Sequence, residues 1–259
     1  MATPRAIVIR TAGTNCDRET VFALEQAGFY VQPVHINRLV ESPDSLHDFQ
    51  FIVIPGGFTY GDDIAAGKIL AARIAARLSD PLNRFVEKGN LVLGICNGFQ
   101  VLVKSGLLPW ARINPVNTRQ DVTLTWNDCG RFIERWVYLQ SGEGKCVFLP
   151  RNELITLPIA HGEGKFVTSK PDVINRLKTG GQIALRYSEC PDPPEGYIVN
   201  PNGSEENIAG ICDPSGRILG LMPHPERFVS PIQHPRWTRE YPKRADGRLF
   251  FDNAFALLT

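Results

Sequence analysis

The sequence contains no run of about 20 apolar residues, which is the length that an α-helix needs to span a membrane. Residues 1–5 lead directly into a strand-like apolar stretch, without the long apolar region of a secretion signal. We therefore expect neither a membrane helix nor secretion.

An excess of charge of one sign is also missing. The chain has 28 basic and 27 acidic residues, so its formal net charge is +1. Proteins that bind nucleic acid carry a strongly basic surface. The composition therefore gives no support for a nucleic-acid partner.

The cysteines and histidines lack the spacing of a disulfide framework or a metal site. Six cysteines stand at positions 16, 96, 129, 146, 190 and 212, without a CxxC pair. The histidines do not show the i,i+4 spacing with which a helix binds a metal ion. These patterns predict reduced thiols, a cytoplasmic protein and no metal site.

A phosphate-binding loop is lacking as well. Residues 61–68 contain glycines and a lysine, but five residues separate Gly61 from Gly67 where the motif has four. Ile69 stands where the motif has the hydroxyl residue that reaches magnesium. We therefore expect no ATP site and no cofactor in this chain.

The sequence does contain an alternation of apolar, strand-like runs and amphipathic, helix-like stretches. After Gly106 the pattern changes to alternating segments rich in β-branched and aromatic residues. These observations predict one α/β domain over residues 1–259, with a mostly parallel sheet flanked by helices and additional antiparallel strands. The predicted parallel strands are 6–9, 31–36, 51–54 and 91–95, the helices 17–27, 64–78, 81–88 and 249–258, and the antiparallel strands 122–127 and 132–139.

The segment Gly94-Ile95-Cys96-Asn97-Gly98 follows an apolar run and opens an amphipathic stretch. A nucleophile on a strand-to-helix turn has a strained backbone, and a glycine two residues away on each side removes side chains that would collide. A helix N-terminus also favours thiolate over thiol. Cys96 is therefore a candidate nucleophile, although a buried cysteine on a core strand would fit this pentapeptide equally well.

Met222-Pro223-His224-Pro225-Glu226-Arg227 places a histidine and a carboxylate two residues apart. The prolines favour an extended backbone, which projects both side chains to one side. His224 could then act as a base and Glu226 could hold its tautomer. A proline-rich surface loop is the alternative.

The apolar run 52–54 ends in Pro55-Gly56-Gly57-Phe58. Paired glycines at the end of a strand allow backbone N–H groups to face a ligand. Beside an elbow, the N–H groups of Gly57 and Asn97 could stabilise an oxyanion. A tight turn without this role would also fit the glycines.

Taken together, these segments resemble the class I (triad) glutamine amidotransferases, whose pattern is a Gly-Gly oxyanion strand, a Gly-x-Cys-x-Gly elbow and a late His-Pro-Glu. Further segments resemble one branch of that family, the glutaminase subunits of phosphoribosylformylglycinamidine synthase. The segments that carry this resemblance are 13–18, 56–63, 94–100, 159–166, 200–204, 208–211 and 222–227.

The resemblance implies a flavodoxin-like fold and a Cys-His-Glu triad. Cys96 would attack the side-chain amide of glutamine, His224 would protonate the departing ammonia, and Glu226 would hold His224. The ammonia would pass to a synthetase subunit that uses ATP and magnesium to make formylglycinamidine ribonucleotide in purine biosynthesis. A small third subunit is also expected.

Three further residues are candidates for the glutamine pocket. Phe58 follows the paired glycines, and Gln100 lies one helical turn after Cys96, on the same side of the helix. His161 stands in a glycine-flanked segment that the resemblance places over the glutamine site or the partner face. Gln100 could equally be a solvated polar residue, and the segment around His161 would ordinarily be read as a turn.

Cys16 is expected to pack behind the start of the helix at 17–27, with Asn15 or Asp17 as its cap. The resemblance gives no conformation for residues 229–246. Two alternative functions stay open: an amidotransferase that serves another pathway, and a catalytically silent scaffold on the same fold.

Overall fold

The computed structural model describes residues 2–114, 120–193, 195–239 and 241–259. Its main feature is a nine-stranded sheet with the strand order β2-β1-β3-β4-β11-β10-β9-β6-β7. A separate two-stranded sheet consists of β5 (Val122–Thr125) and β8 (Lys165–Thr168). No helix in the described part of the chain is both long and apolar enough to cross a membrane.

One half of the large sheet is parallel. Its strands are β2 (Tyr30–His35), β1 (Arg5–Arg10), β3 (Phe51–Ile54), β4 (Leu91–Ile95) and β11 (Ile218–Leu221). Every residue of β3, β4 and β11 is buried, because helices cover both faces of the sheet here. This explains why these strands are continuous apolar runs in the sequence.

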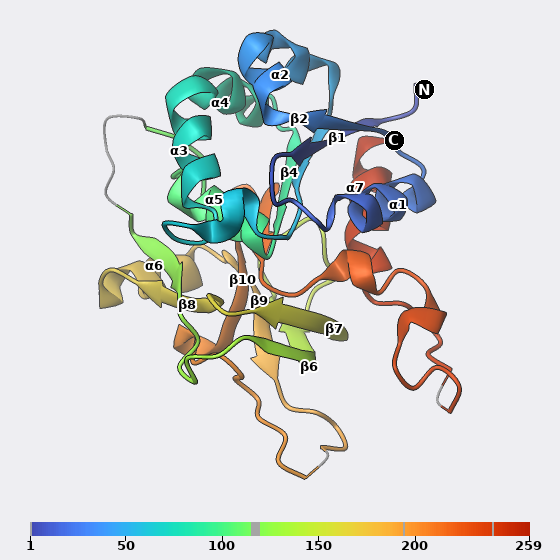
Figure 1. Ribbon diagram of the computed structural model, residues 1–259. Coiled ribbons are helices and arrows are strands. Elements are labelled where there is room, and N and C mark those ends of the chain that lie inside the picture. The colour runs from blue at the N-terminus through green and yellow to red at the C-terminus, as the bar shows by residue number, and fades with distance from the viewer. Residues whose placement is uncertain (1, 115–119, 194, 240) are drawn as a thin grey trace.

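Helices flank the parallel strands on two sides (Figure 1). Helices α1 (Asp17–Ala27) and α7 (Arg248–Leu258) pack against each other on one side. On the other side lie α3 (Lys68–Arg77), α4 (Ser79–Glu87) and α5 (Asn97–Lys104). The short helix α2 (Ile36–Glu41) follows β2.

The other half of the large sheet is antiparallel, as the alternating segments predict. It contains β10 (Ile208–Cys212), β9 (Ile183–Ser188), β6 (Ile133–Ser141) and β7 (Leu154–His161). Burial alternates along β6 and β7, which reflects one face packed on the core and one face more exposed. Helix α6 (Pro171–Thr179) lies beside β8 in this half.

The predicted elements agree with the structure apart from their ends. The strand predicted at 31–36 ends at His35, because the Nδ1 atom of His35 accepts the N–H of Asn37 at 3.2 Å and so caps α2. The helix predicted at 64–78 begins only at Lys68, after Gly67 with a φ of 72°. Its predicted apolar face is correct, since Leu70, Ile74 and Leu78 are buried.

Residues 229–246, except residue 240, which lies outside the described residues, lead from the sheet to α7. The ring of His234 packs against those of Phe228 and Trp136. Asp246 accepts the backbone N–H of Thr156 at 2.8 Å, on the edge strand β7. The segment therefore lies against an edge of the sheet that would otherwise be open.

Candidate active site

Cys96 lies on a sharp turn between β4 and α5. Its φ is +51° and its ψ is −104°, a combination that side chains other than glycine rarely adopt. A strained non-glycine backbone of this kind is frequent at functional sites, where the surrounding packing maintains it. The predicted elbow is therefore present.

The two glycines of the elbow are required by close packing. A Cβ atom on Gly98 would lie 1.9 Å from the carbonyl oxygen of Ile54 on the neighbouring strand β3. A Cβ atom on Gly94 would lie 2.6 Å from Cδ1 of Leu102 and 2.7 Å from the backbone of Gly98. The missing side chains allow α5 to start directly against the sheet.

His224 and Glu226 form a buried pair. The Nδ1 atom of His224 lies 2.6 Å from Oε1 of Glu226, and the two side chains are 2% and 0% exposed. The backbone is not extended as the prolines predict. Residues Pro225–Arg227 form a 3₁₀ turn, because Pro225 starts it with a suitable fixed φ, and this turn brings the two side chains together.

The negative charge of Glu226 raises the pKa of the His224 imidazole. Burial by itself lowers the pKa of His224, but the charge of Glu226 and then the thiols of Cys96 and Cys16 outweigh it, so the pKa lies well above its usual value. The Nε2 atom of His224 has no hydrogen-bond partner among the described residues. The imidazole is therefore oriented by Glu226 through Nδ1 and has Nε2 available for chemistry.

Cys16 belongs to this neighbourhood, which the sequence did not predict. It is the N-cap residue of α1, without a side-chain cap from Asn15 or Asp17, so the expected caps are wrong. Its Sγ atom accepts an N–H of Arg227 at 3.2 Å. A Cβ atom on Gly56 would lie 3.3 Å from this sulfur and 2.8 Å from Cε1 of His224, so Gly56 makes room for both groups.

Ligand atoms of Cys16, His224 and Glu226 lie within 4.8 Å of one another. No sequence pattern indicates that a cysteine lies near this histidine, because 208 positions separate Cys16 from His224 in the chain. The guanidinium of Arg227 beside Cys16 places positive charge where a cation would sit. This charge opposes metal binding, and the absence of a metal site stays a prediction.

The predicted oxyanion donors lie on both sides of Cys96. Gly57 has a φ of +132°, and its N–H has no acceptor among the described residues. Asn97 is the first residue of α5, where backbone N–H groups lack acceptors within the helix. The side chain of Asn97 is held by Thr59, whose hydroxyl donates to its Oδ1 at 2.7 Å.

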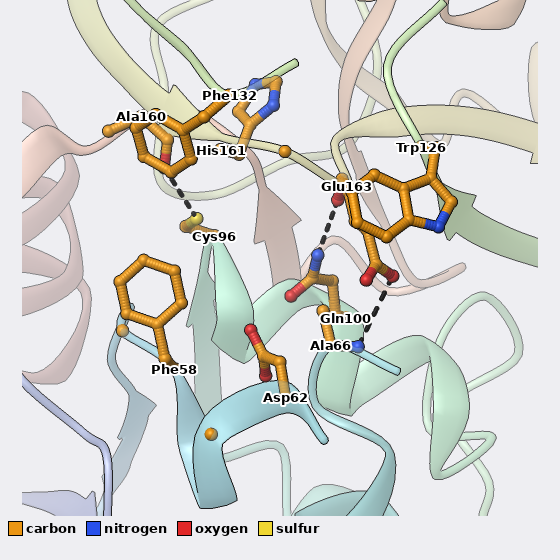
Figure 2. A pocket seen from close by; sticks show the side chains of 13 residues that line it. Phe58, Asp62, Ala66, Cys96, Gln100, Trp126, Phe132, Ala160, His161 and Glu163 are labelled. Carbon is orange, nitrogen blue, oxygen red and sulfur yellow. Dashed lines mark hydrogen bonds between the residues drawn. The ribbon is translucent and has the colours of Figure 1, made fainter. Parts of the chain in front are cut away.

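A cavity of about 320 Å³ opens beside Cys96, and Figure 2 shows the side chains that line it. All three predicted pocket residues are among them: Phe58, Gln100 and His161. A second space of about 150 Å³ shares Cys96 with this cavity and is lined by His224. Cys96, the candidate nucleophile, therefore lies between the larger of these two cavities and the imidazole of His224.

Gln100 is more constrained than a solvated residue would be. Its Nε2 atom donates to the carbonyl of Glu163 at 2.5 Å, and its Oε1 atom accepts from Nδ2 of Asn97 at 3.1 Å. Phe58 is 47% exposed, and its ring lies 6.4 Å from that of Phe132. Gln100 thus forms the floor of the cavity, and the two phenylalanines form its rim.

His161 lies in the wall of the cavity, and of its two ring nitrogens Nδ1 has a hydrogen-bond partner and Nε2 has none among the described residues. Asn127 donates through Nδ2 to the carbonyls of Arg131 and His161, so its Oδ1 is an acceptor and Nδ1 of His161, 3.1 Å away, carries the proton. Burial and then the charge of His224 lower the pKa of His161 to about 3. In Figure 2 the ring points away from Cys96.

Several lining residues were not singled out from the sequence. Asp62 and Glu163 add two carboxyl groups, and Trp126 and Phe132 add aromatic rings. The acidic residues stand inside the segments 56–63 and 159–166, so the resemblance contained a signal for them. Trp126 and Phe132 stand at the ends of predicted strands, where the sequence does not indicate which cavity they face.

Residues 3–257 match the family model of the CobB/CobQ-like glutamine amidotransferase domain. The phosphoribosylformylglycinamidine synthase subunit PurQ of Dehalococcoides mccartyi is 47% identical over 256 residues, which cover 98% of this chain and 97% of that protein. The chain belongs to the PurQ family. The PurQ subunit of Picrophilus torridus is 39% identical, with 97% of each chain covered.

Solved structures agree with this membership. The PurLQS structure from Thermotoga maritima matches with a TM-score of 0.74 at 33% identity, covering 100% of both chains. The glutaminase domain of the CTPS of Trypanosoma brucei, solved with acivicin, has a TM-score of 0.56 at 16% identity. The second likeness shows the fold alone, and both confirm the predicted class I glutamine amidotransferase architecture.

Proposed function

We propose that this PurQ family member is the glutaminase subunit of a phosphoribosylformylglycinamidine synthase, and that Cys96, His224 and Glu226 are its catalytic residues. One observation carries the assignment of the residues. A cysteine with a strained backbone lies at the start of a helix, between a cavity and a histidine that is held by a buried carboxylate.

The first half of the reaction forms a thioester. The thiolate of Cys96 attacks the side-chain amide carbon of glutamine, and the N–H groups of Gly57 and Asn97 stabilise the negative charge that develops on the amide oxygen. The raised pKa of His224 keeps the imidazole protonated at neutral pH. His224 then gives the proton on Nε2 to the departing ammonia as the carbon–nitrogen bond breaks.

The second half restores the enzyme. His224 takes a proton from a water molecule, whose oxygen attacks the thioester carbon. The same two backbone N–H groups stabilise the second tetrahedral intermediate. Its collapse breaks the carbon–sulfur bond, releases glutamate and leaves Cys96 ready for another cycle.

The released ammonia serves a partner. The PurQ relatives are subunits of phosphoribosylformylglycinamidine synthase, and the similar solved structure is a PurLQS assembly. We infer that a synthetase subunit receives the ammonia and uses ATP to make formylglycinamidine ribonucleotide, with a small third subunit in the complex. A cytoplasmic location is part of this proposal and is supported by six cysteines that are all free.

The test uses a glutamine analogue that carries an electrophile. We expect covalent mass on Cys96, detected by peptide mass spectrometry, and none in Cys96→Ala. Cys129→Ala is the matched control, because Cys129 is an exposed cysteine that does not line the cavity. Labelling of another cysteine in place of Cys96 would contradict the assignment.

Reconstitution tests the pathway. The chain and its synthetase partner are mixed with formylglycinamide ribonucleotide, ATP and glutamine, and the amidine product is measured. We expect product only with both proteins. Labelling of Cys96 without any amidine product would indicate an amidotransferase of another pathway.

A further inference from the structure

Asp62 lies on a strained turn that directs its side chain into the cavity of about 320 Å³ beside Cys96. Tyr60, Gly61 and Asp62 have φ values of +55°, +71° and +53°, so two of these three left-handed residues carry a side chain. Such residues are costly and persist where the surroundings enforce them. Here Tyr60 N–H donates to Ala12 at 2.8 Å and the Tyr60 hydroxyl accepts from Arg73 at 2.5 Å.

The carboxylate of Asp62 is only partly satisfied by the protein. Its Oδ1 atom accepts from Nδ2 of Asn97 at 3.0 Å and from the N–H of Gly67 at 3.1 Å. Its Oδ2 atom has no hydrogen-bond partner among the described residues. Figure 2 shows this carboxylate between Phe58 and Gln100, on the side of the cavity that lies below Cys96.

Among the described residues, the cation nearest to Asp62 in electrostatic effect is Lys104, whose ammonium is hydrogen-bonded elsewhere. Burial raises the pKa of Asp62, which shows that the charged form lacks solvation in the empty cavity. The nearby ammonium of Lys104 donates to the carbonyl of Ala66 and divides its electrostatic attraction between Glu163 and Asp62. A cationic group in the cavity would therefore gain a partner at Asp62.

Glutamine brings such a group. Only a few bonds separate its α-ammonium from the amide carbon that Cys96 attacks, and Asp62 contacts the residue directly after Cys96. We propose that Asp62 binds the α-ammonium group of the glutamine substrate and so determines specificity for an α-amino acid. This inference rests on the proposed glutaminase function.

Glu163 is the competing anchor, because it is the other carboxylate that lines the cavity among the described residues. Its Oε2 atom already accepts the N–H of Ala66 at 3.4 Å, and its charge faces Lys104. Each carboxylate keeps one oxygen without a hydrogen-bond partner among the described residues, but Asp62 is the one that contacts Asn97, directly after Cys96. These contacts favour Asp62 over Glu163.

The experiment compares two substrates in the reconstituted complex. One is glutamine and the other is glutaramate, which has the same amide and carboxylate but no α-amino group. Asp62→Asn keeps an oxygen for the Asn97 and Gly67 donors, and asparagine tolerates a left-handed backbone. We expect kcat/KM for glutamine to fall about a hundredfold, as for the loss of one partner of a desolvated charge pair, and kcat/KM for glutaramate to change little.

The ratio of kcat/KM for glutamine to kcat/KM for glutaramate separates the possible outcomes. If Asp62 acts only by positioning Asn97, both substrates lose equally and the inference fails. If the ratio stays at its wild-type value in Asp62→Asn and collapses in Glu163→Gln, then Glu163 is the anchor and the inference fails. Asp63→Asn is the matched control, because it removes the same charge from an exposed neighbour and should leave the ratio unchanged.

A chemical readout distinguishes this failure from failure of the proposed function. Iodoacetamide has no ammonium group, so it should alkylate Cys96 at similar rates in wild type and Asp62→Asn. A diazoketone analogue of glutamine should label Asp62→Asn far more slowly than wild type. Absence of labelling of Cys96 by either reagent in wild type would instead refute the glutaminase assignment.

Discussion

At the scale of single residues, we expect the hydrogen bond between His224 and Glu226 to control the proposed reaction. Glu226→Gln removes the charge that raises the pKa of His224, so the imidazolium becomes less stable. We expect glutaminase turnover to fall by about 10³-fold or more, as when the orienting carboxylate of another triad is neutralised. Iodoacetamide should also alkylate Cys96 more slowly at pH 7.

Glu143→Gln is the control for this change, because Glu143 is an exposed carboxylate outside both cavities. It should keep wild-type turnover and alkylation rate. Equal alkylation rates in wild type and Glu226→Gln across pH 5 to 9 would show that the carboxylate does not influence the thiol.

His161 should make stability sensitive to acid. Its folded pKa of about 3 lies below the value near 6.5 of an unfolded histidine, so the unfolded chain binds more protons between these values and stability falls as the pH drops. Between pH 7 and pH 5 the loss is about 2 kcal/mol. Urea unfolding at both pH values should show this loss in wild type but not in His161→Asn.

His224 has the opposite sign, because its raised pKa stabilises the fold below the unfolded value and this contribution is lost as the pH rises through the folded value. His224 is present in both wild type and His161→Asn, so its contribution to the pH dependence of stability largely cancels when the two proteins are compared. An equal loss in wild type and His161→Asn would show that His161 is protonated in the folded protein.

The local part of the site can be predicted from the sequence, but the part that depends on packing between distant segments cannot. Cys96 with its two glycines is a contiguous pattern, and its strained turn is confirmed. Cys16 could not be placed, because its contact with Arg227 spans 211 positions. The orientation of Asp62 depends on a turn in which two non-glycine residues adopt φ values that their own preferences oppose.

At the scale of elements, the elbow depends on the contact between α5 and β3. Gly98→Ala would place a methyl group against the Ile54 carbonyl, where a Cβ atom lies at 1.9 Å, so the helix must shift. We expect a destabilisation of several kcal/mol and loss of Cys96 labelling by the glutamine analogue. Differential scanning fluorimetry and mass spectrometry would measure both effects.

Gly89→Ala is the control, because Gly89 stands shortly before β4 in the parallel half and has open space around its missing side chain. Its φ of +77° makes an alanine there cost about 1 kcal/mol from strain alone. Effects no larger for Gly98→Ala than for Gly89→Ala would show that the contact with Ile54 does not limit the elbow.

The strands and helices of the parallel half could be predicted closely because each is a local pattern. Helix α1 begins and ends where the periodicity places it. The partner of a strand is not a local property: β5 pairs with β8, about 40 residues later, rather than joining the large sheet. The 3₁₀ turns likewise depend on single hydrogen bonds that no periodicity indicates.

At the scale of the whole molecule, the two edge strands of the large sheet are protected from pairing with other chains. Each carries a proline, Pro33 in β2 and Pro158 in β7, which removes a backbone donor. On β7 the N–H of His224 also donates to the carbonyl of Pro158 at 2.9 Å. The edge of the sheet therefore helps to position His224, the proposed catalytic base.

The open rim of the cavity predicts dependence on a partner. Phe58, Trp126 and Phe132 are 47%, 63% and 53% exposed, so the mouth is bordered by aromatic rings that water still reaches. We expect the isolated chain to release glutamate from glutamine more slowly than the complex, because docking orders the oxyanion loop. A coupled glutamate assay with and without the synthetase subunit would measure this, and equal rates would contradict it.

The two halves of the sheet meet only through β10 and β11, which come late in the chain. A polypeptide still emerging from the ribosome possesses its nucleophile long before it possesses residues 208–226. Until these are synthesised, the parallel and antiparallel strands have no hydrogen-bonded connection and the thiol has no imidazole beside it.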